Sequence, residues 1–283
     1  MAISAAMVKE LREKTGAGMM DCQRALSEAD GNLEEAIKIL RKKGLAAAAK
    51  KAGRTAKDGL VVIVGDSREA AMAEINCETD FVARTEEFQT FARAIAEQAR
   101  SEKLSDVATA MLRPAGFDPG QTIAQALASK IAKIGENILF SRVAYLAAGA
   151  DTQLGTYLHM GGKIGVIVEL SASADEETVK DVAMHIAAAE PRWVRRDEVA
   201  AEVINEEREI ARAQAAAAGK PAQVLDKIAD GKVGKFFEQF CLVDQAFVKD
   251  PAQTVGAMLA AKGGVTVTRF VRFRLGEGAA AAQ

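Results

Sequence analysis

The residue types best suited to chemistry lie together in one stretch, Asn76-Cys77-Glu78-Thr79-Asp80-Phe81-Val82-Ala83-Arg84. Cys77 is a potential nucleophile, but the carboxylates that neighbour it disfavour the thiolate form that attacks substrates. Thr79 and Asp80 have side-chain oxygens that accept hydrogen bonds from the free N–H groups at the start of a helix. Taken alone, these residues favour an ordinary capped helix, in whose first turn Phe81 either packs into the core or points outward.

The imidazoles give little support to an enzyme. His185 lies on an Ala- and Ile-rich helical face, where we expect a hydrogen-bonded core histidine, and His159 precedes Gly161 and Gly162 in a predicted turn. A turn histidine is either an interface contact or solvated. No Gly-rich turn ends in Gly-Lys-Ser/Thr, as a phosphate-binding loop requires. We therefore expect no cofactor, metal or nucleotide on the chain, and an enzyme that uses Cys77 or His159 is the weaker alternative.

Composition points to a protein partner. The chain has 283 residues, of which 49% are hydrophobic, and a formal net charge of -2. This charge is too small to attract nucleic acid or a membrane surface in general. No apolar run is long enough to cross a bilayer, and the odd, widely spaced cysteines favour free thiols in a reducing cytoplasm. These cysteines are Cys22, Cys77 and Cys241.

The first 53 residues predict a three-helix domain and a linker. Ser4 and Asn32 suit the starts of the first and third helices, and Gly44 is expected to end the third. The segment from 45 to 57 then reads as a helical or frayed linker with a basic cluster of Lys50, Lys51 and Arg54. No aromatic residue is interleaved to stack on bases, so a solvated linker is favoured over a nucleic-acid site.

The rest of the chain predicts an α+β core of two related halves, each with a small antiparallel sheet covered by helices. The halves are residues 54–153, and residues 154–196 together with 229–275. Each begins with a hairpin that leads into a capped helix, over 59–64, 69–76 and 86–100 in the first half and over 156–158, 164–170 and 173–189 in the second.

A helical arm and a tail complete the predicted organisation. Residues 197–228 have a narrow, Ala-rich apolar seam, which is typical of an antiparallel coiled-coil hairpin, with Asp197 capping one arm and Pro221 beginning the other. The arm could dimerise the protein or touch a partner. Residues 276–283 are small and predict a flexible tail.

Four stretches in order resemble the elongation factor Ts family, whose members are guanine nucleotide exchange factors for elongation factor Tu. The resemblance also implies that the three-helix domain is of the ubiquitin-associated type. The first stretch is the one from Asn76 to Arg84, and the others are Val8-Lys9-Glu10-Leu11-Arg12 with Thr15-Gly16-Ala17-Gly18-Met19-Met20-Asp21-Cys22, Lys133-Ile134-Gly135-Glu136-Asn137, and His159-Met160-Gly161-Gly162-Lys163-Ile164-Gly165-Val166.

The resemblance implies that the chain binds GDP-bound elongation factor Tu and promotes GDP release without covalent chemistry, so that GTP can rebind. In the family, the Thr-Asp-Phe-Val turn inserts beside the magnesium site of the partner. Carried over, Asp80 and Phe81 wedge apart the elements that position Mg²⁺ and the phosphates, and Thr79 and Val82 shape the turn.

Two further contact regions follow from the resemblance. One is the N-terminal set Lys9, Arg12, Met19 and Met20; the adjacent methionines cannot both face the core, so we expect one to be exposed. The other contains His159, Gly161 and Gly162. The alternative function is a non-enzymatic adaptor that captures a ubiquitin-like or helical partner through the three-helix domain, which leaves the other stretches without a role.

Overall fold

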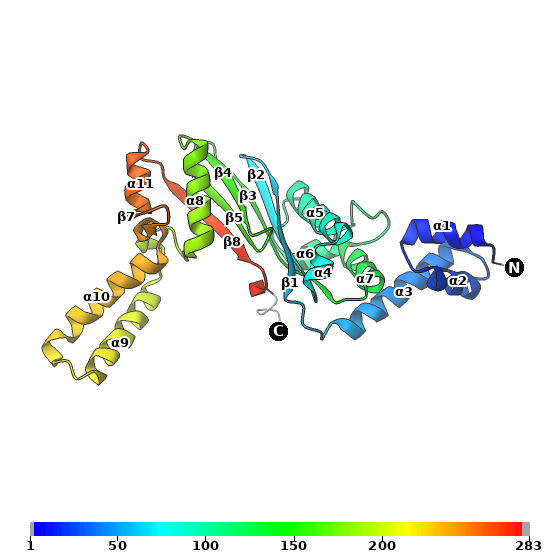
Figure 1. The fold of residues 1–283 in the computed structure, drawn as a ribbon, viewed down its shortest axis with the longest axis horizontal. Coiled ribbons are helices and arrows are strands. Elements are labelled where there is room, and N and C mark those ends of the chain that lie inside the picture. The colour runs from blue at the N-terminus through cyan, green and yellow to red at the C-terminus, as the bar shows by residue number, and fades with distance from the viewer. Residues whose placement is uncertain (1–2, 279–283) are drawn as a thin grey trace.

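In the computed structural model, which describes residues 3–278, the elements are spread along one long axis (Figure 1). Helices α1 (Ala5–Thr15), α2 (Met19–Glu28) and α3 (Leu33–Lys51) lie at one end, and a hairpin of α9 (Ala201–Ala217) and α10 (Ala222–Phe240) lies at the other. Two antiparallel three-stranded sheets and their covering helices lie between them. The predicted α+β class is confirmed.

The N-terminal unit forms because the sequence supplies both helix starts and an apolar side for each helix. Ser4 Oγ accepts from the N–H of Met7 at 3.3 Å, and Asn32 Oδ1 accepts from the N–H groups of Glu34 and Glu35 at 3.0 and 3.1 Å. The apolar sides meet in a small core of Leu11, Cys22, Ala25, Leu26 and Ala36.

Gly44 does not end the third helix as the sequence predicted. Helix α3 continues to Lys51 and packs along α7 (Ile123–Ile134) of the core. A Cβ atom at Gly44 would lie 3.7 Å from the carbonyl oxygen of Ala128 and 3.9 Å from Cβ of Ala132. The glycine therefore lets two helices approach closely, and this packing outweighs its low helix propensity of about 1 kcal/mol relative to alanine.

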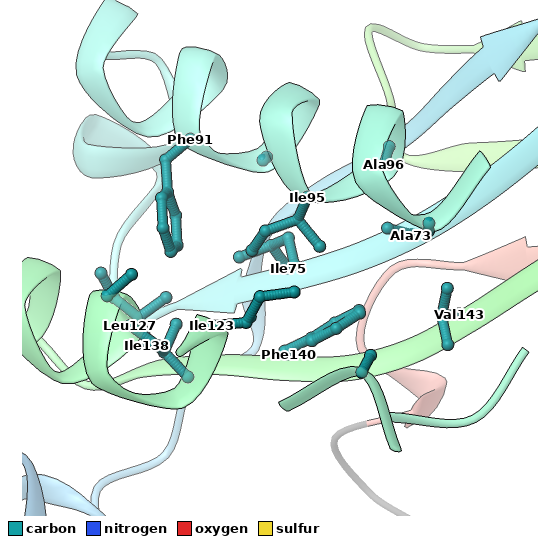
Figure 2. Close-up of a cluster of buried hydrophobic side chains, with 14 of the residues drawn as sticks. Ala73, Ile75, Phe91, Ile95, Ala96, Ile123, Leu127, Ile138, Phe140 and Val143 are labelled. Atoms are coloured by element: carbon teal, nitrogen blue, oxygen red, sulfur yellow. The ribbon is translucent and has the colours of Figure 1, made fainter. Parts of the chain in front are cut away.

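The first sheet consists of β1 (Asp58–Gly65), β2 (Glu69–Cys77) and β3 (Ile138–Ala147), paired in that order. One of its faces is covered by α5 (Glu86–Ser101) and α7, and α6 (Val107–Leu112) lies beside β3. The alternation along β2 sends every second side chain into this layer. The buried cluster in Figure 2 includes Ile75, Phe91, Ile95, Ile123 and Phe140.

The second sheet repeats this plan with β4 (Thr152–His159), β5 (Ile164–Ser171) and β8 (Val267–Arg274). Helix α8 (Glu176–Ala189) covers it, and α11 (Val255–Ala261) lies nearby (Figure 1). The strands and the helix meet in a buried layer that includes Val166, Val168, Val182, Ile186 and Leu259. A short pair, β6 (Ala246–Phe247) with β7 (Asp250–Thr254), was not predicted from the sequence.

The remaining faces of the two sheets pack against each other. The backbone N–H of Val61 in β1 donates to the carbonyl oxygen of Gly162 at 2.8 Å, which ties the two halves together. Gly165 lies at the contact, where a Cβ atom would be 2.6 Å from Cγ1 of Val61 and 2.7 Å from Sδ of Met72. The side chains between the sheets are Val61, Met72, Leu146, Leu154, Ile167 and Phe273.

Gly165→Ala is expected to lower the free energy of unfolding by about 1–3 kcal/mol, because the added methyl group overlaps atoms of the facing sheet. Urea denaturation measures this change. Gly234→Ala is the matched control, since Gly234 lies in α10 with open space around its Cβ position, and there the free energy should rise by about 0.5–1 kcal/mol. Equal stability of Gly165→Ala and the parent would contradict close packing of the sheets.

Three helix starts in the C-terminal half differ from prediction. Helix α8 is capped by Asp175, whose Oδ1 accepts from the N–H of Thr178 at 2.7 Å, and not by the predicted box at Ser173. Asp197 lies in a 3₁₀ turn over Arg196–Glu198 that precedes α9, so it does not cap that helix. Pro221 is the residue just before α10 and not its first residue.

The helical arm has the predicted Ala-rich seam. Ala211 and Ala215 of α9 and Leu225 of α10 are buried, and Arg208 pairs with Asp230 at 2.9 Å across the hairpin. Helix α10 runs without a break through the predicted boundary at 228 to Phe240, because its apolar side continues through the buried Ala229 and Val233 into the core. The predicted division into domains stays a prediction.

The predicted flexible tail is anchored where the structure describes it. The N–H of Gly276 donates to Oε1 of Glu74 at 2.8 Å, and Glu277 pairs with Arg142 at 3.6 Å and with Arg272 at 3.7 Å. The buried Glu74 carboxylate thus holds the start of this segment. Residues 279–283 lie outside the described part of the chain.

His185 in α8 is the hydrogen-bonded core histidine that the sequence predicted. It is fully buried, with Nε2 2.9 Å from Oε1 of Gln245, and its Nδ1 accepts from the N–H of Val248 at 3.2 Å. An accepting Nδ1 places the ring proton of the neutral form on Nε2. Burial lowers the pKa of His185 below its ordinary value, and the bond to Gln245 opposes this only in part.

This lowered pKa predicts a loss of stability in mild acid. The unfolded chain takes up a proton at His185 near pH 6.5, while the folded chain resists it, so the contribution is complete above about pH 6.5 and falls below it. The loss is up to about 1.4 kcal/mol per pH unit. Urea unfolding at about pH 7.5 and about pH 5.5 should show a smaller loss in His185→Gln than in the parent. Equal losses would contradict this assignment.

Candidate partner-binding site

The Thr79 turn lies where β2 leaves the first sheet. A four-residue helix, α4 (Asp80–Ala83), follows the strand, and Thr79 caps it by accepting from the N–H of Val82 at 3.3 Å. The longer helix α5 begins only after a second cap, Thr85, whose Oγ1 accepts from the N–H of Phe88 at 3.3 Å. The sequence predicted one helix capped by Thr79 and Asp80, whereas two successive caps make two helices.

Glu136 fixes the entrance of this turn. Its Oε2 accepts from the backbone N–H groups of Glu78 and Thr79 at 3.1 and 3.0 Å, and its Oε1 accepts from Oγ1 of Thr79 at 2.7 Å. Gly135 precedes it in left-handed conformation, with φ 89°, and turns the chain from α7 towards β3. One carboxylate thus holds two backbone groups and the capping side chain, using charge-assisted hydrogen bonds.

A second set of contacts holds the other side of the turn. The N–H of Asn137 donates to Oε1 of Glu78 at 2.6 Å, and Nδ2 of Asn137 donates to the carbonyl oxygen of Arg54 at 2.8 Å. Arg54 returns to Glu78 with an ion pair at 3.4 Å. Asn137 is buried, and these bonds join the segment before β1, the Thr79 turn and the start of β3. We call this set of contacts, which includes Glu78, Thr79, Glu136 and Asn137, the rigid corner.

Phe81 is the part of this corner that faces solvent. Its side chain is 77% exposed, whereas Ala83 is buried and Val82 is partly buried against the core. Asp80 pairs with Arg84 at 2.7 Å, with 41% of its side chain exposed. Of the two orientations that the sequence left open for Phe81, the structure has the outward one.

Cys77 lies beneath the turn, with Sγ donating to the carbonyl oxygen of Thr79 at 3.1 Å. Burial, followed by the charges of Glu136 and Asp58, raises the pKa of the Cys77 thiol to about 12. A thiol with this pKa is almost wholly protonated near neutral pH, so Cys77 is a poor nucleophile.

The turn between β4 and β5 is a second exposed feature. His159 stacks on Tyr157 with ring centroids 5.9 Å apart, and its Nδ1 lies 3.2 Å from the Tyr157 hydroxyl. Met160, which is 71% exposed, and the two glycines after it all have positive φ. Gly161 is exposed, but Gly162 is buried, so its role is to join the sheets and not to present a surface.

Strand pairing brings the two turns to the same end of the core. Asp58 at the start of β1 is the partner of Cys77, the last residue before the Thr79 turn. Lys163, which follows the second turn, reaches Asp58 with an ion pair at 3.1 Å. Residues more than eighty positions apart therefore lie at one edge, next to the exposed Phe81.

The N-terminal candidates form a separate surface. Lys9 and Arg12 are exposed on α1, and Lys9 lies 3.8 Å from Glu13. Met19 and Met20 at the start of α2 are both exposed, at 60% and 65%, where the sequence required only one to be. This surface is carried on the N-terminal unit and is connected to the core through α3.

Sequence reasoning assigned no role to Glu136 and Asn137, although both belong to a stretch that carried the family resemblance. Their partners at Glu78 and Arg54 lie far from them in sequence, so spacing gave no indication of the contact. One signal was available: an acidic residue directly after a helix-ending glycine, at the edge of a predicted sheet, next to the capped turn.

Comparison with known families agrees with these motifs. A family model described as elongation factor TS matches residues 78–277, which begins at the Thr79 turn and includes both sheets and the hairpin. The chain belongs to the elongation factor Ts family. Members of this family are translation elongation factors that act as nucleotide exchange factors for elongation factor Tu, without covalent chemistry of their own. None of the helices in residues 3–278 is long and apolar enough to cross a membrane.

Proposed function

We propose that this elongation factor Ts family member releases GDP from elongation factor Tu by inserting Phe81 beside the partner's magnesium site. The observation that carries this proposal is a 77% exposed phenylalanine on a turn whose neighbours are all fixed. An exposed aromatic side chain is costly in water unless a partner covers it. Held on a rigid corner, Phe81 can push against a partner instead of bending away from it.

The residues around Phe81 have different roles in the proposed mechanism. Asp80 offers an exposed carboxylate to the region where Mg²⁺ and the phosphates are held, and Arg84 keeps it in place. Thr79 shapes the turn as its cap, and Val82 fastens it to the core. Displacement of the partner's Mg²⁺ removes the charge that holds the GDP phosphates, after which GTP can rebind.

The energetics require a wide contact. If this protein lowers the affinity of elongation factor Tu for nucleotide, then bound nucleotide must lower the affinity of elongation factor Tu for this protein by the same factor. A thousandfold faster release through destabilisation of the bound state needs about 4 kcal/mol, and burial of one Phe supplies ~1.5–3 kcal/mol. We assign the remainder to two further contacts. One uses Lys9, Arg12, Met19 and Met20 on the N-terminal unit, and the other uses His159 and Gly161 at the second turn, which the buried Gly162 holds against β1.

Release of fluorescent GDP from purified elongation factor Tu tests this function, with this protein added in substoichiometric amounts. Faster release with many turnovers per molecule is the expected result. Binding to elongation factor Tu without faster GDP release favours the adaptor function. The N-terminal unit is then the part to test for partner binding. Absence of both overturns the proposal.

The remaining expectations concern location and assembly. We place the protein in the cytoplasm with the translation machinery, acting on a protein partner without direct contact to nucleic acid or membrane. The α9–α10 hairpin, on which Ile210 is 44% and Val224 38% exposed, is the candidate surface for a homodimer or for another contact with the partner.

A further inference from the structure

A cleft of about 470 Å³ separates the N-terminal unit from the core, beside the contact between α3 and α7. One wall comes from α3 and from the turn between α1 and α2, and the other comes from α7 and the loop before it. The size is within the range of small-molecule sites, and the walls combine apolar and charged side chains. They include Ile37, Leu40, Arg41, Asp118, Ala132 and Lys133.

Two cations cross this cleft from opposite walls. Arg41 extends from α3 towards the core, where its Nη2 is 3.4 Å from the Cβ position of Gly120. Lys133 extends from α7 towards the N-terminal unit, where its Cδ is 3.6 Å from the Cβ position of Gly16. Each of these side chains therefore passes a glycine that has no side chain to crowd it, and the Lys133 ammonium ends on the carboxylate of Glu87 at 2.7 Å.

Arg41 is incompletely satisfied. Its Nε is buried without a hydrogen-bond partner, and within residues 3–278 Arg41 makes no ion pair. Lys133 shares the single carboxylate of Glu87 with Lys130, at 2.7 and 2.9 Å. Two carboxylates line the cleft, and each has a partner: Asp118 accepts from the side chain of Gln121 at 2.8 Å, and Asp21 pairs with Arg24 at 2.7 Å. The Arg41 guanidinium, which lines the cleft, therefore has no carboxylate to balance its charge within the described residues.

We propose that this cleft binds a small phosphate-bearing anion between Arg41 and Lys133. The planar guanidinium matches two phosphate oxygens at once, and the ammonium supplies a second charge from the other wall. The apolar residues of α3 leave room for an organic group attached to the phosphate.

A bound anion joins two parts of the molecule that otherwise meet mainly along α3 and α7. It fixes the N-terminal unit, with Met19 and Met20, relative to the core, with Phe81. The two surfaces that we assign to the partner are then held in one relative orientation. This inference concerns a ligand of this chain itself and stands independently of the exchange mechanism.

Titration calorimetry on the full chain tests the site with pyrophosphate and, separately, with adenosine diphosphate. We expect saturable binding of at least one of them, weakened at high salt, and at least about tenfold weaker in Arg41→Met and in Lys133→Met. Binding of adenosine diphosphate but not of pyrophosphate would indicate that the organic group contacts the apolar wall. Arg212→Met, on the distant hairpin, is the control and should bind like the parent.

Two results overturn the proposal. One is a lack of binding of both probes by the parent at low salt. The other is unchanged affinity in both Arg41→Met and Lys133→Met, each shown to be folded by its thermal unfolding transition. If one variant fails to fold, the other still decides, because the two side chains come from different helices.

Discussion

Phe81→Ala is expected to slow GDP release from elongation factor Tu by about ten- to a hundredfold, because the side chain's contact with the partner is worth ~1.5–3 kcal/mol. The fold should not change, since Phe81 is 77% exposed and contributes little to the core. Linkage adds a sharper expectation: affinity for the nucleotide-free partner should fall by about the same factor, while affinity for the GDP-bound partner changes little. Stopped-flow release of fluorescent GDP and calorimetry with both partner forms measure these quantities.

Leu112→Ala is the matched control for this experiment. Leu112 in α6 is 78% exposed, close to the 77% of Phe81, but it does not lie in the rigid corner. Its replacement should leave the exchange rate within about a factor of two of the parent, as for a surface change of ±0.5 kcal/mol. Parent-like exchange by Phe81→Ala would remove the wedge from the mechanism, and an equal loss in Leu112→Ala would show that exposed apolar area alone is responsible.

Local signals in the sequence were sufficient to predict most elements. Caps at Ser4 and Asn32 act within three residues of themselves, so the sequence pattern contains the whole interaction. The two hairpins and the helix that follows each of them likewise depend on neighbours in the chain. Gly44 shows where this logic fails, because its effect depends on α7, which lies some eighty residues away.

The candidate site was predicted only in part, for the same physical reason. Family motifs pointed to the Thr79 turn, but the direction of Phe81 depends on which neighbours fill the core, and these are Val82 and Ala83. The join between the two turns depends on the pairing of Asp58 with Cys77, a tertiary contact. The family motif therefore located the turn, and packing determined which side chain the turn exposes.

Glu136→Ala is expected to slow nucleotide exchange by about tenfold or more, although Glu136 is not predicted to touch the partner. Without its carboxylate, the N–H groups of Glu78 and Thr79 and the Thr79 hydroxyl lose their acceptor, and the turn that carries Phe81 becomes mobile. Phe81 then yields to contact with the partner and no longer displaces the elements around the partner's magnesium site. Glu136→Gln keeps one acceptor oxygen and should give an intermediate rate.

A readout at the turn distinguishes positioning from general instability. Hydrogen exchange of the Glu78 and Thr79 amides should speed up in Glu136→Ala, while partner binding persists and GDP release slows. Glu102→Ala is the matched control, since Glu102 also accepts from two side chains, Arg113 at 2.5 Å and Gln98 at 2.7 Å, away from the turn. It should lose comparable stability without slowing exchange. Glu136 contacts Glu78 and Thr79 just before the wedge, whereas Glu102 bonds to Arg113 and Gln98. Equal slowing in both variants would therefore show that Glu136 acts through overall stability.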